Sequence, residues 1–236
     1  MNRPSILFAC WPVLSICILW AGCVKLEKPY PQKKSYVLEV RRNGESRPAS
    51  DETVLLVRNF TGAARFRGRG FVYRTGQLQY QADFYHEFFT APAAMISEES
   101  GRWLQQSGLF GHVTEGGEPP PTHLLQGRIN ALFGDYRPGQ PPTAVLELHL
   151  ALIDDRGVST QILLDGRYRR EIPLADRSPQ TLLQGWNSAL QEILTEFERD
   201  LQPTLQAPSC DQEPSSVPGK DTLEAQNLRM EMTFGQ

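Results

Sequence analysis

The stretch Ala144–Leu152, AVLELHLAL, decides the fold, because its apolar and polar residues alternate with a period of two. One alanine and four leucines occupy every second position and would share one face of an extended chain: Ala144, Leu146, Leu148, Leu150 and Leu152. Glu147 and His149 fall on the other face. The stretch therefore predicts a β-strand with one buried face and one face in solvent.

The segments on either side carry the same alternation. Leu124–Phe133 places five residues on one face: Leu125, Gly127, Ile129, Ala131 and Phe133. After a turn at Asp154-Asp155-Arg156-Gly157, Gln161–Ile172 returns with its own inward set: Ile162, Leu164, Gly166, Tyr168 and Ile172. Three half-polar strands with short connections predict an antiparallel meander that is covered on one face.

Shorter strands are expected nearer the start of the chain. Tyr36–Arg41 and Thr53–Phe60 alternate in the same way and are separated by a polar loop. Phe71–Arg74 and Leu78–Ala82 flank Thr75-Gly76, which predicts a hairpin.

Two helices are expected to cover the sheet. Pro92–Ser107 starts at a proline and stops before Gly108. The second helix has Ser178 as its N-cap, Pro179 in its first turn and an apolar stripe through Trp186 to Leu201, and Pro203 marks its expected end. The fold class predicted is α/β (α+β), a two-layer sandwich with a mostly antiparallel sheet and two helices packed on one face.

The first 22 residues have the order of a secretory signal peptide. A short positive start precedes the uncharged apolar run Ile6–Trp20, and small residues follow it. An uncleaved membrane anchor is the alternative, although the run is shorter than the ~20 apolar residues that span a bilayer and contains Pro12.

Ala21-Gly22-Cys23 resembles a bacterial lipobox, in which the signal is cut before a cysteine that then carries lipid. Several acyl chains on one residue anchor a protein far more firmly than one chain does. The resemblance implies lipidation at Cys23 and, because Val24 and not Asp follows, the bacterial outer membrane, with the domain facing the periplasm. Residues 23–34 are then a lipidated, lysine-rich tether.

The region 35–202 is expected to be the folded domain, and 203–236 a disordered tail rich in proline, serine and acids. The alternative for Leu223–Phe234 is a short helix that docks on a partner. Cys210 in this tail is interpreted as incidental, with intermolecular pairing as the alternative.

The chain carries little that indicates chemistry. A net charge of −3 gives no basic footprint for nucleic acid. His86-Glu87 lacks the second histidine of a metalloprotease helix, and Asp154-Asp155 is interpreted as part of a turn. No catalytic residue, metal or cofactor is therefore expected, and the protein is predicted not to be an enzyme.

The block Phe71–Phe110 combines a Tyr-Arg pair, Asp-x-Tyr-x-x-x-Phe and a proline-initiated helix that ends in Ser-Gly-Leu-Phe. With the Leu-Leu-Val-Arg strand before it and the Trp186 helix after it, this pattern resembles the ABC-type transport auxiliary lipoprotein family over 35–202. The resemblance implies a non-enzymatic lipoprotein subunit that works beside an ATPase, a permease and an MCE-domain protein in moving lipids or other hydrophobic molecules. The alternative is another outer-membrane assembly or secretion lipoprotein, such as a pilotin or a lipopolysaccharide-assembly partner.

Candidate partner-binding residues cluster in the same block. The segment 71–89 is rich in aromatic residues, and exposed aromatic patches often mark partner sites. Arginines at positions 58 to 74 could pair with acidic protein or with lipid headgroups. The residues proposed for partner binding are Arg65, Arg67, Arg69, Tyr73, Tyr85 and Phe88. A homo-oligomer is a further possibility for the assembly.

Overall fold

The computed structural model describes residues 32–46, 52–116, 118–157 and 160–206 of the chain. Residues 1–22, Cys23 and nearly all of the tether lie outside this part, as do residues 207–236 with Cys210. No helix within the described part combines the length and the apolar character that crossing a membrane requires.

Three long antiparallel strands form one side of the sheet, and the last of them along the chain is its edge. They are β7 (His123–Asp135), β8 (Thr143–Asp154) and β9 (Gln161–Pro173). On β8, Leu146, Leu148 and Leu150 are at most 1% exposed, while Glu147 and His149 between them are half-buried. The predicted meander, with one covered face, is confirmed.

Two β-bulges change the direction of residues that the simple alternation placed inward. Asn130 is unpaired between Ile129 and Ala131, so Phe133 points away from the helices and stacks on Phe66 with ring centroids 6.1 Å apart. A register shift at the start of β9 turns Ile162 outward in the same way, and its side chain is 65% exposed. An extra residue reverses the facing of the positions on one side of it, so the inward assignments of Ala131, Phe133 and Ile162 were wrong.

Short strands extend the sheet on the other side of β7, and five of the eight strand pairings are parallel. Those that pair with β7 are β2 (Val54–Val57), β3 (Thr61–Gly62) and β4 (Gly70–Arg74). β6 (His112–Thr114) adds to β2, β5 (Tyr80–Phe88) pairs with β4 as the predicted hairpin, and β1 (Lys34–Tyr36) adds to β5. The sheet has nine strands and is mixed, with the antiparallel part in the long strands.

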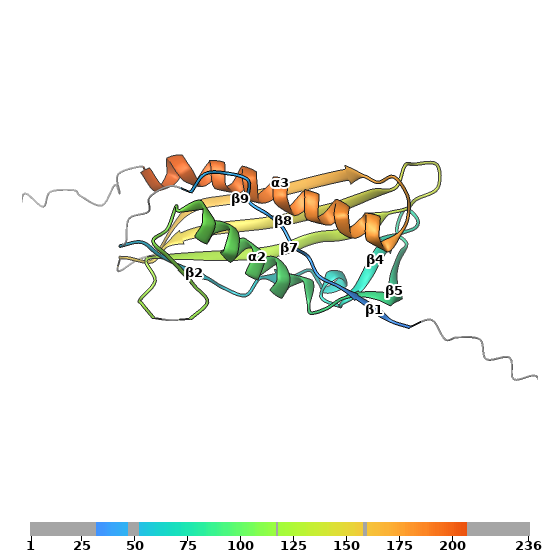
Figure 1. Ribbon diagram of the computed structural model, residues 1–236, viewed down its shortest axis with the longest axis horizontal. Coiled ribbons are helices and arrows are strands. Elements are labelled where there is room, and N and C mark those ends of the chain that lie inside the picture. The colour runs from blue at the N-terminus through green and yellow to red at the C-terminus, as the bar shows by residue number, and fades with distance from the viewer. Residues whose placement is uncertain (1–31, 47–51, 117, 158–159, 207–236) are drawn as a thin grey trace, which may run out of the picture.

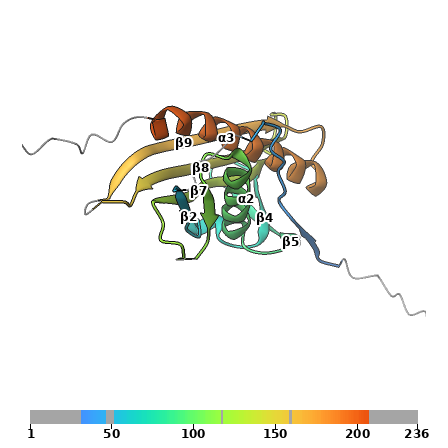
Figure 2. The same cartoon turned by 60° about the vertical axis from the view of Figure 1, so that its left-hand side comes forward.

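Both helices lie on one face of the sheet, side by side (Figures 1 and 2). α2 (Pro92–Ser107) ends at Gly108 in the left-handed conformation, and α3 (Pro179–Gln206) begins after Ser178, whose Oγ accepts a hydrogen bond from the Thr181 amide. The predicted two-layer arrangement of helices on a sheet is confirmed. At the centre of the core, Trp186 of α3 is fully buried against Phe71 and Phe88.

Helix α3 continues past Pro203 to Gln206, beyond the end that the proline predicts. A proline inside a helix removes one backbone donor. The Thr204 hydroxyl donates to the Asp200 carbonyl oxygen at 3.0 Å, and Leu201 and Leu205 still pack on the core. Local side-chain bonding and apolar contact therefore carry the helix through the proline.

The segment 37–46 is not the strand that its alternation predicts. Strand pairing ends at Tyr36, and the chain then runs between the two helices, as Figure 1 shows. Leu38 is buried, and the Glu39 and Val40 amides donate to the Asn187 and Glu99 side chains of α3 and α2. We call this segment the strap.

Candidate functional site

The face of the sheet opposite the helices, the helix-free face, is polar along β8 and β9. Cross-strand polar pairs occupy it, among them the hydrogen-bonded pair His149–Asp165 and the ion pair of Arg169 with Glu147, the latter at 2.9 Å. Charged pairs of this kind favour contact with water over burial in a second apolar layer.

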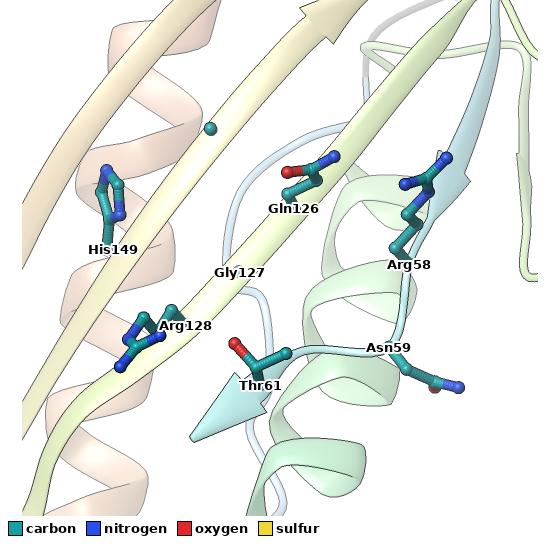
Figure 3. A pocket seen from close by; sticks show the side chains of 8 residues that line it. Arg58, Asn59, Thr61, Gln126, Gly127, Arg128 and His149 are labelled. Carbon is teal, nitrogen blue, oxygen red and sulfur yellow. The ribbon is translucent and has the colours of Figure 1, made fainter. Parts of the chain in front are cut away.

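A groove of about 370 Å³ runs along this face beside β7. Its lining comes from the segment after β2 and from β7 and β8 (Figure 3): Arg58, Asn59, Thr61, Gln126, Gly127, Arg128, His149 and Ala151. β3 and β7 are in register at Thr61 and Arg128, and Arg128 lies opposite His149 on β8. The sheet register itself therefore brings these side chains together.

Local backbone geometry explains how Arg58 reaches the groove. The Arg58 amide donates to the Leu125 carbonyl oxygen at 3.0 Å, and its own carbonyl accepts from Ser97 of α2. Phe60 then turns inward, where its ring lies so close to Gly127 that a Cβ there would come within 2.5 Å of it. This packing requires a glycine at position 127. The polar residues around Gly127 lie on the helix-free face.

Two cations in the groove are free to receive a ligand. Arg58 and Arg128 are both exposed, and neither guanidinium has an ion-pair or hydrogen-bond partner among the residues that the structure describes. A guanidinium offers donors in a planar fork that matches a carboxylate or a phosphate. The groove is thus suited to an acidic group on a partner.

The three arginines proposed from the sequence lie in or beside η2 (Ala64–Phe66), which follows β3. Arg65 stacks over the rings of Phe66 and Tyr80 at 5.6 and 5.5 Å and stays exposed. Arg67 donates to the Gly62 carbonyl oxygen, and Arg69 donates to Phe88 O at 3.0 Å and to Glu87 Oε1 at 2.7 Å. Arg67 and Arg69 therefore hold the local backbone, and Arg65 is the most available of the three.

The three aromatic residues proposed from the sequence lie in two different environments. Tyr73 and Tyr85 line one hollow of about 540 Å³ near the start of α3. The Tyr73 hydroxyl donates to Asp83 at 2.8 Å, and burial together with this bond raises the pKa of Tyr73. Phe88 is only 1% exposed and packs on Phe71 and Trp186, so it belongs to the core and cannot contact a partner.

The acid and histidine pairs considered from the sequence have structural partners. Burial alone would raise the pKa of Asp83, but hydrogen bonds from Tyr73, His86 and two backbone amides hold it below its usual value. The Arg156 guanidinium lowers the pKa of Asp154 to about 2 and closes the turn as expected. Among the described residues, no group of three or more His, Cys, Asp or Glu side chains could hold a metal ion.

The groove was missed in the sequence because no local pattern joins Arg58 to Arg128. In the sequence, Arg58 is one of several arginines between positions 58 and 74, and Arg128 falls on the polar face of the strand expected over Leu124–Phe133. The one usable signal was the outward position of Gln126 and Arg128 on that strand. Their meeting with Arg58 depends on the parallel pairing of β2 and β3 with β7.

Comparison with known proteins supports the fold. No protein-family model matches the chain, and no curated protein does. The solved structure of XCC0632 from Xanthomonas campestris, family DUF330, superposes with a TM-score of 0.63 at 16% identity, over 72% of this chain and 95% of that one. An uncharacterised protein gives 0.57 at 15% identity, over 72% and 99%.

A third structure, from Caulobacter crescentus, is described as a candidate lipoprotein. Its TM-score of 0.37 at 14% identity, over 49% of this chain and 84% of that one, is too low to carry an argument. The first two likenesses show that the fold is shared with known structures.

Proposed function

We propose that this protein is a non-enzymatic, lipid-anchored subunit of an envelope transport system for lipids or other hydrophobic molecules. In this proposal Cys23 carries the anchor at the outer membrane. The folded domain binds protein partners in the periplasm, among them the MCE-domain protein of an ABC-type transporter. The lipobox and the resemblance of 35–202 to auxiliary lipoproteins support this role, and the fold shared with the DUF330 structure is compatible with it.

The observation that carries the docking role is the groove on the helix-free face. It gathers the free guanidinium groups of Arg58 and Arg128 beside His149, which is paired with Asp165. Such a surface can bind an acidic segment, because the guanidinium groups supply hydrogen-bond donors. The lining residues show no evident nucleophile. Complementary charge at an interface accelerates association and selects among partners.

Charge reversal in the groove tests the docking role. The double variant Arg58→Glu, Arg128→Glu should capture less of the MCE-domain partner in co-purification from membranes, because two attractive contacts become repulsive. The matched control is Arg41→Glu, whose side chain is 87% exposed and which belongs to the strap, a segment bonded to the helices on the opposite face. Equal capture by both variants would remove the groove from the proposal.

A second test separates docking from catalysis. Replacing His86, Glu87, Asp154 or Asp155 singly with Ala should leave envelope function in the cell intact, provided that the variant folds. A hydrolase would instead lose its function through one such group while its partners still bind. Loss of function in one of these variants, with fold and complex unaltered, would overturn the non-enzymatic role.

Anchoring has its own test. Cys23→Ser should abolish the incorporation of labelled palmitate and leave the precursor uncut, because the thiol that accepts lipid is absent. Normal labelling of this variant would refute the assignment of Cys23.

A further inference from the structure

Exposed apolar side chains gather at one edge of the sheet. The described residues include six large hydrophobic side chains that are exposed, and four of them belong to β5 and to the chain beside it: Val37 at 55%, Phe84 at 68%, Tyr85 at 39% and Phe89 at 64%. We call these four residues the aromatic edge. Scattered exposed side chains are ordinary, but a group on one edge requires an explanation.

The pairing of β1 with β5 places two of these side chains, Val37 and Phe89. β1 and β5 are parallel with Tyr36 opposite Phe88, and the Phe89 amide donates to the Tyr36 carbonyl oxygen at 2.8 Å. Phe88 points into the core, so Val37 and Phe89, the next residues on the two chains, point outward together.

Phe84 and Tyr85 reach the edge through an irregular turn in β5. The Asp83 carboxylate accepts hydrogen bonds from the amides of Tyr85 and His86 and so shapes this turn. The two rings meet edge to face, with centroids 5.2 Å apart. Hydrogen bonding therefore holds two apolar rings in solvent, a costly arrangement unless another surface covers them.

Basic side chains border the aromatic edge. Lys33 Nζ lies 4.6 Å above the centre of the Phe84 ring and 3.6 Å from Glu87, which also accepts a hydrogen bond from Arg69. Lys25–Lys34 contains four lysines and one glutamate, so the chain leading to the edge is positive. Aromatic rings flanked by lysine are typical of surfaces that rest at the headgroup level of anionic bilayers.

The position of the edge along the chain identifies what covers it. Lys33 follows the proposed lipidated residue, Cys23, by ten residues, which span no more than about 35 Å when fully extended. β1 begins at Lys34 and lies beside β5 in both views (Figures 1 and 2). An anchor at Cys23 therefore keeps the start of β1, and with it this edge, within about 35 Å of the bilayer.

We propose that the aromatic edge is a membrane-contact surface that lies against an anionic phospholipid bilayer, with Phe84 and Phe89 in the interface and Lys33 at the headgroups. This inference rests on the lipid anchor of the proposed function. It fixes an orientation for the domain, because one edge of the sheet faces lipid while the groove on the helix-free face remains open to a partner.

Tryptophan quenching in vesicles tests the proposal. The full-length protein, produced with its leader, is reconstituted into phosphatidylethanolamine–phosphatidylglycerol vesicles whose acyl chains carry bromine, which quenches only nearby tryptophan. Phe84→Trp and Phe89→Trp should each add tryptophan fluorescence. This fluorescence should lie at shorter wavelength than that of a tryptophan in water and should be quenched by the brominated lipid. The tryptophans of the described domain, Trp103 and Trp186, are buried and provide a constant background.

The matched control is Ile162→Trp. Ile162 is 65% exposed, close to the 68% of Phe84, but it lies at the start of β9, at the opposite end of the long strands from β1. Its added emission should not be quenched. Equal quenching at positions 84 and 162 would overturn the proposal, and so would the absence of quenching at 84 and 89, which would leave the edge to a protein partner.

Mass spectrometry of the reconstituted protein separates this inference from the proposed function. If Cys23 carries no acyl chain, the anchoring part of the proposed function fails. If Cys23 is acylated and the edge is not quenched, the anchor stands and the membrane-contact surface is wrong.

Discussion

Trp186 of α3 packs the helix layer against the sheet. Its ring is fully buried and meets Phe71 edge to face at 4.9 Å, with Phe88 at 5.4 Å. Its indole Nε1 has no hydrogen-bond partner among the described residues. The contribution of this side chain is therefore apolar packing.

Truncation of this residue gives the first prediction. Trp186→Ala should lower the free energy of unfolding by about 3–5 kcal/mol, because it leaves a large cavity between α3 and the sheet. Trp186→Phe should cost clearly less, since the lost nitrogen makes no bond. Denaturant unfolding of both variants measures the difference, and a near-neutral Trp186→Ala would contradict the packing role.

His123 gives a prediction about pH. Its side chain is 2% exposed, packs on Phe110 and shares a 2.8 Å hydrogen bond with the Thr122 hydroxyl. Burial lowers its pKa, although Asp154 opposes and Arg156 reinforces this shift. The unfolded chain therefore takes up a proton near the ordinary pKa of about 6.5, while the folded protein does so only at lower pH.

The stability that comes from neutral His123 is complete above about pH 6.5 and is lost as the pH falls toward the lower, folded pKa. The loss has a slope of at most about 1.36 kcal/mol per pH unit. His123→Gln should remove this slope from the free energy of unfolding, measured by denaturant titration between about pH 7 and pH 5. The exposed His112→Gln is the control, and an unchanged slope in His123→Gln would contradict the prediction.

At the scale of elements, the strap binds the two helices together. Arg42 Nε and Nη2 donate to the two carboxylate oxygens of Glu198 at 2.9 and 2.8 Å, and the Trp103 indole donates to the same carboxylate. Arg42 and Glu198 side chains are only 7% and 12% exposed. One carboxylate on α3 thus holds both the strap and α2.

Removal of this cation should be costly. Arg42→Ala should lower the free energy of unfolding by about 3 kcal/mol, because the largely buried Glu198 carboxylate loses the charge and the two hydrogen bonds that Arg42 supplies. The adjacent Arg41→Ala should change it by less than about 0.5 kcal/mol, since that side chain is 87% exposed. Equal effects of the two variants in denaturant unfolding would show that the strap does not stabilise the helix pair.

At the scale of the whole molecule, the described domain ends with α3 at Gln206. The composition of the following residues predicts that they bury little surface. Deletion of 207–236 should shift the melting midpoint by no more than about 2 °C. Differential scanning calorimetry measures this, and a far larger drop would mean that these residues pack on the domain.

The sequence by itself determined the elements whose signal is local. The alternation of Ala144–Leu152 and its neighbours established the meander, and Gly108 and Ser178 marked a helix end and a helix start at the residues found. Periodicity and capping depend on neighbours within a few positions, so both can be recognised in the sequence alone. The aromatic richness of 71–89 was also visible, but not which of its rings are exposed.

Only the tertiary structure decided how these elements meet. The bulge at Asn130 sent Phe133 to the opposite face, and long-range contacts turned the expected strand after Tyr36 into the strap. Phe88 is buried because Trp186, nearly a hundred positions away, packs on it, and Arg58 meets Arg128 through parallel strand pairing. Such contacts join residues that are distant in the chain, and the free energy that selects them comes from packing and ion pairing in the assembled core, which no local pattern records.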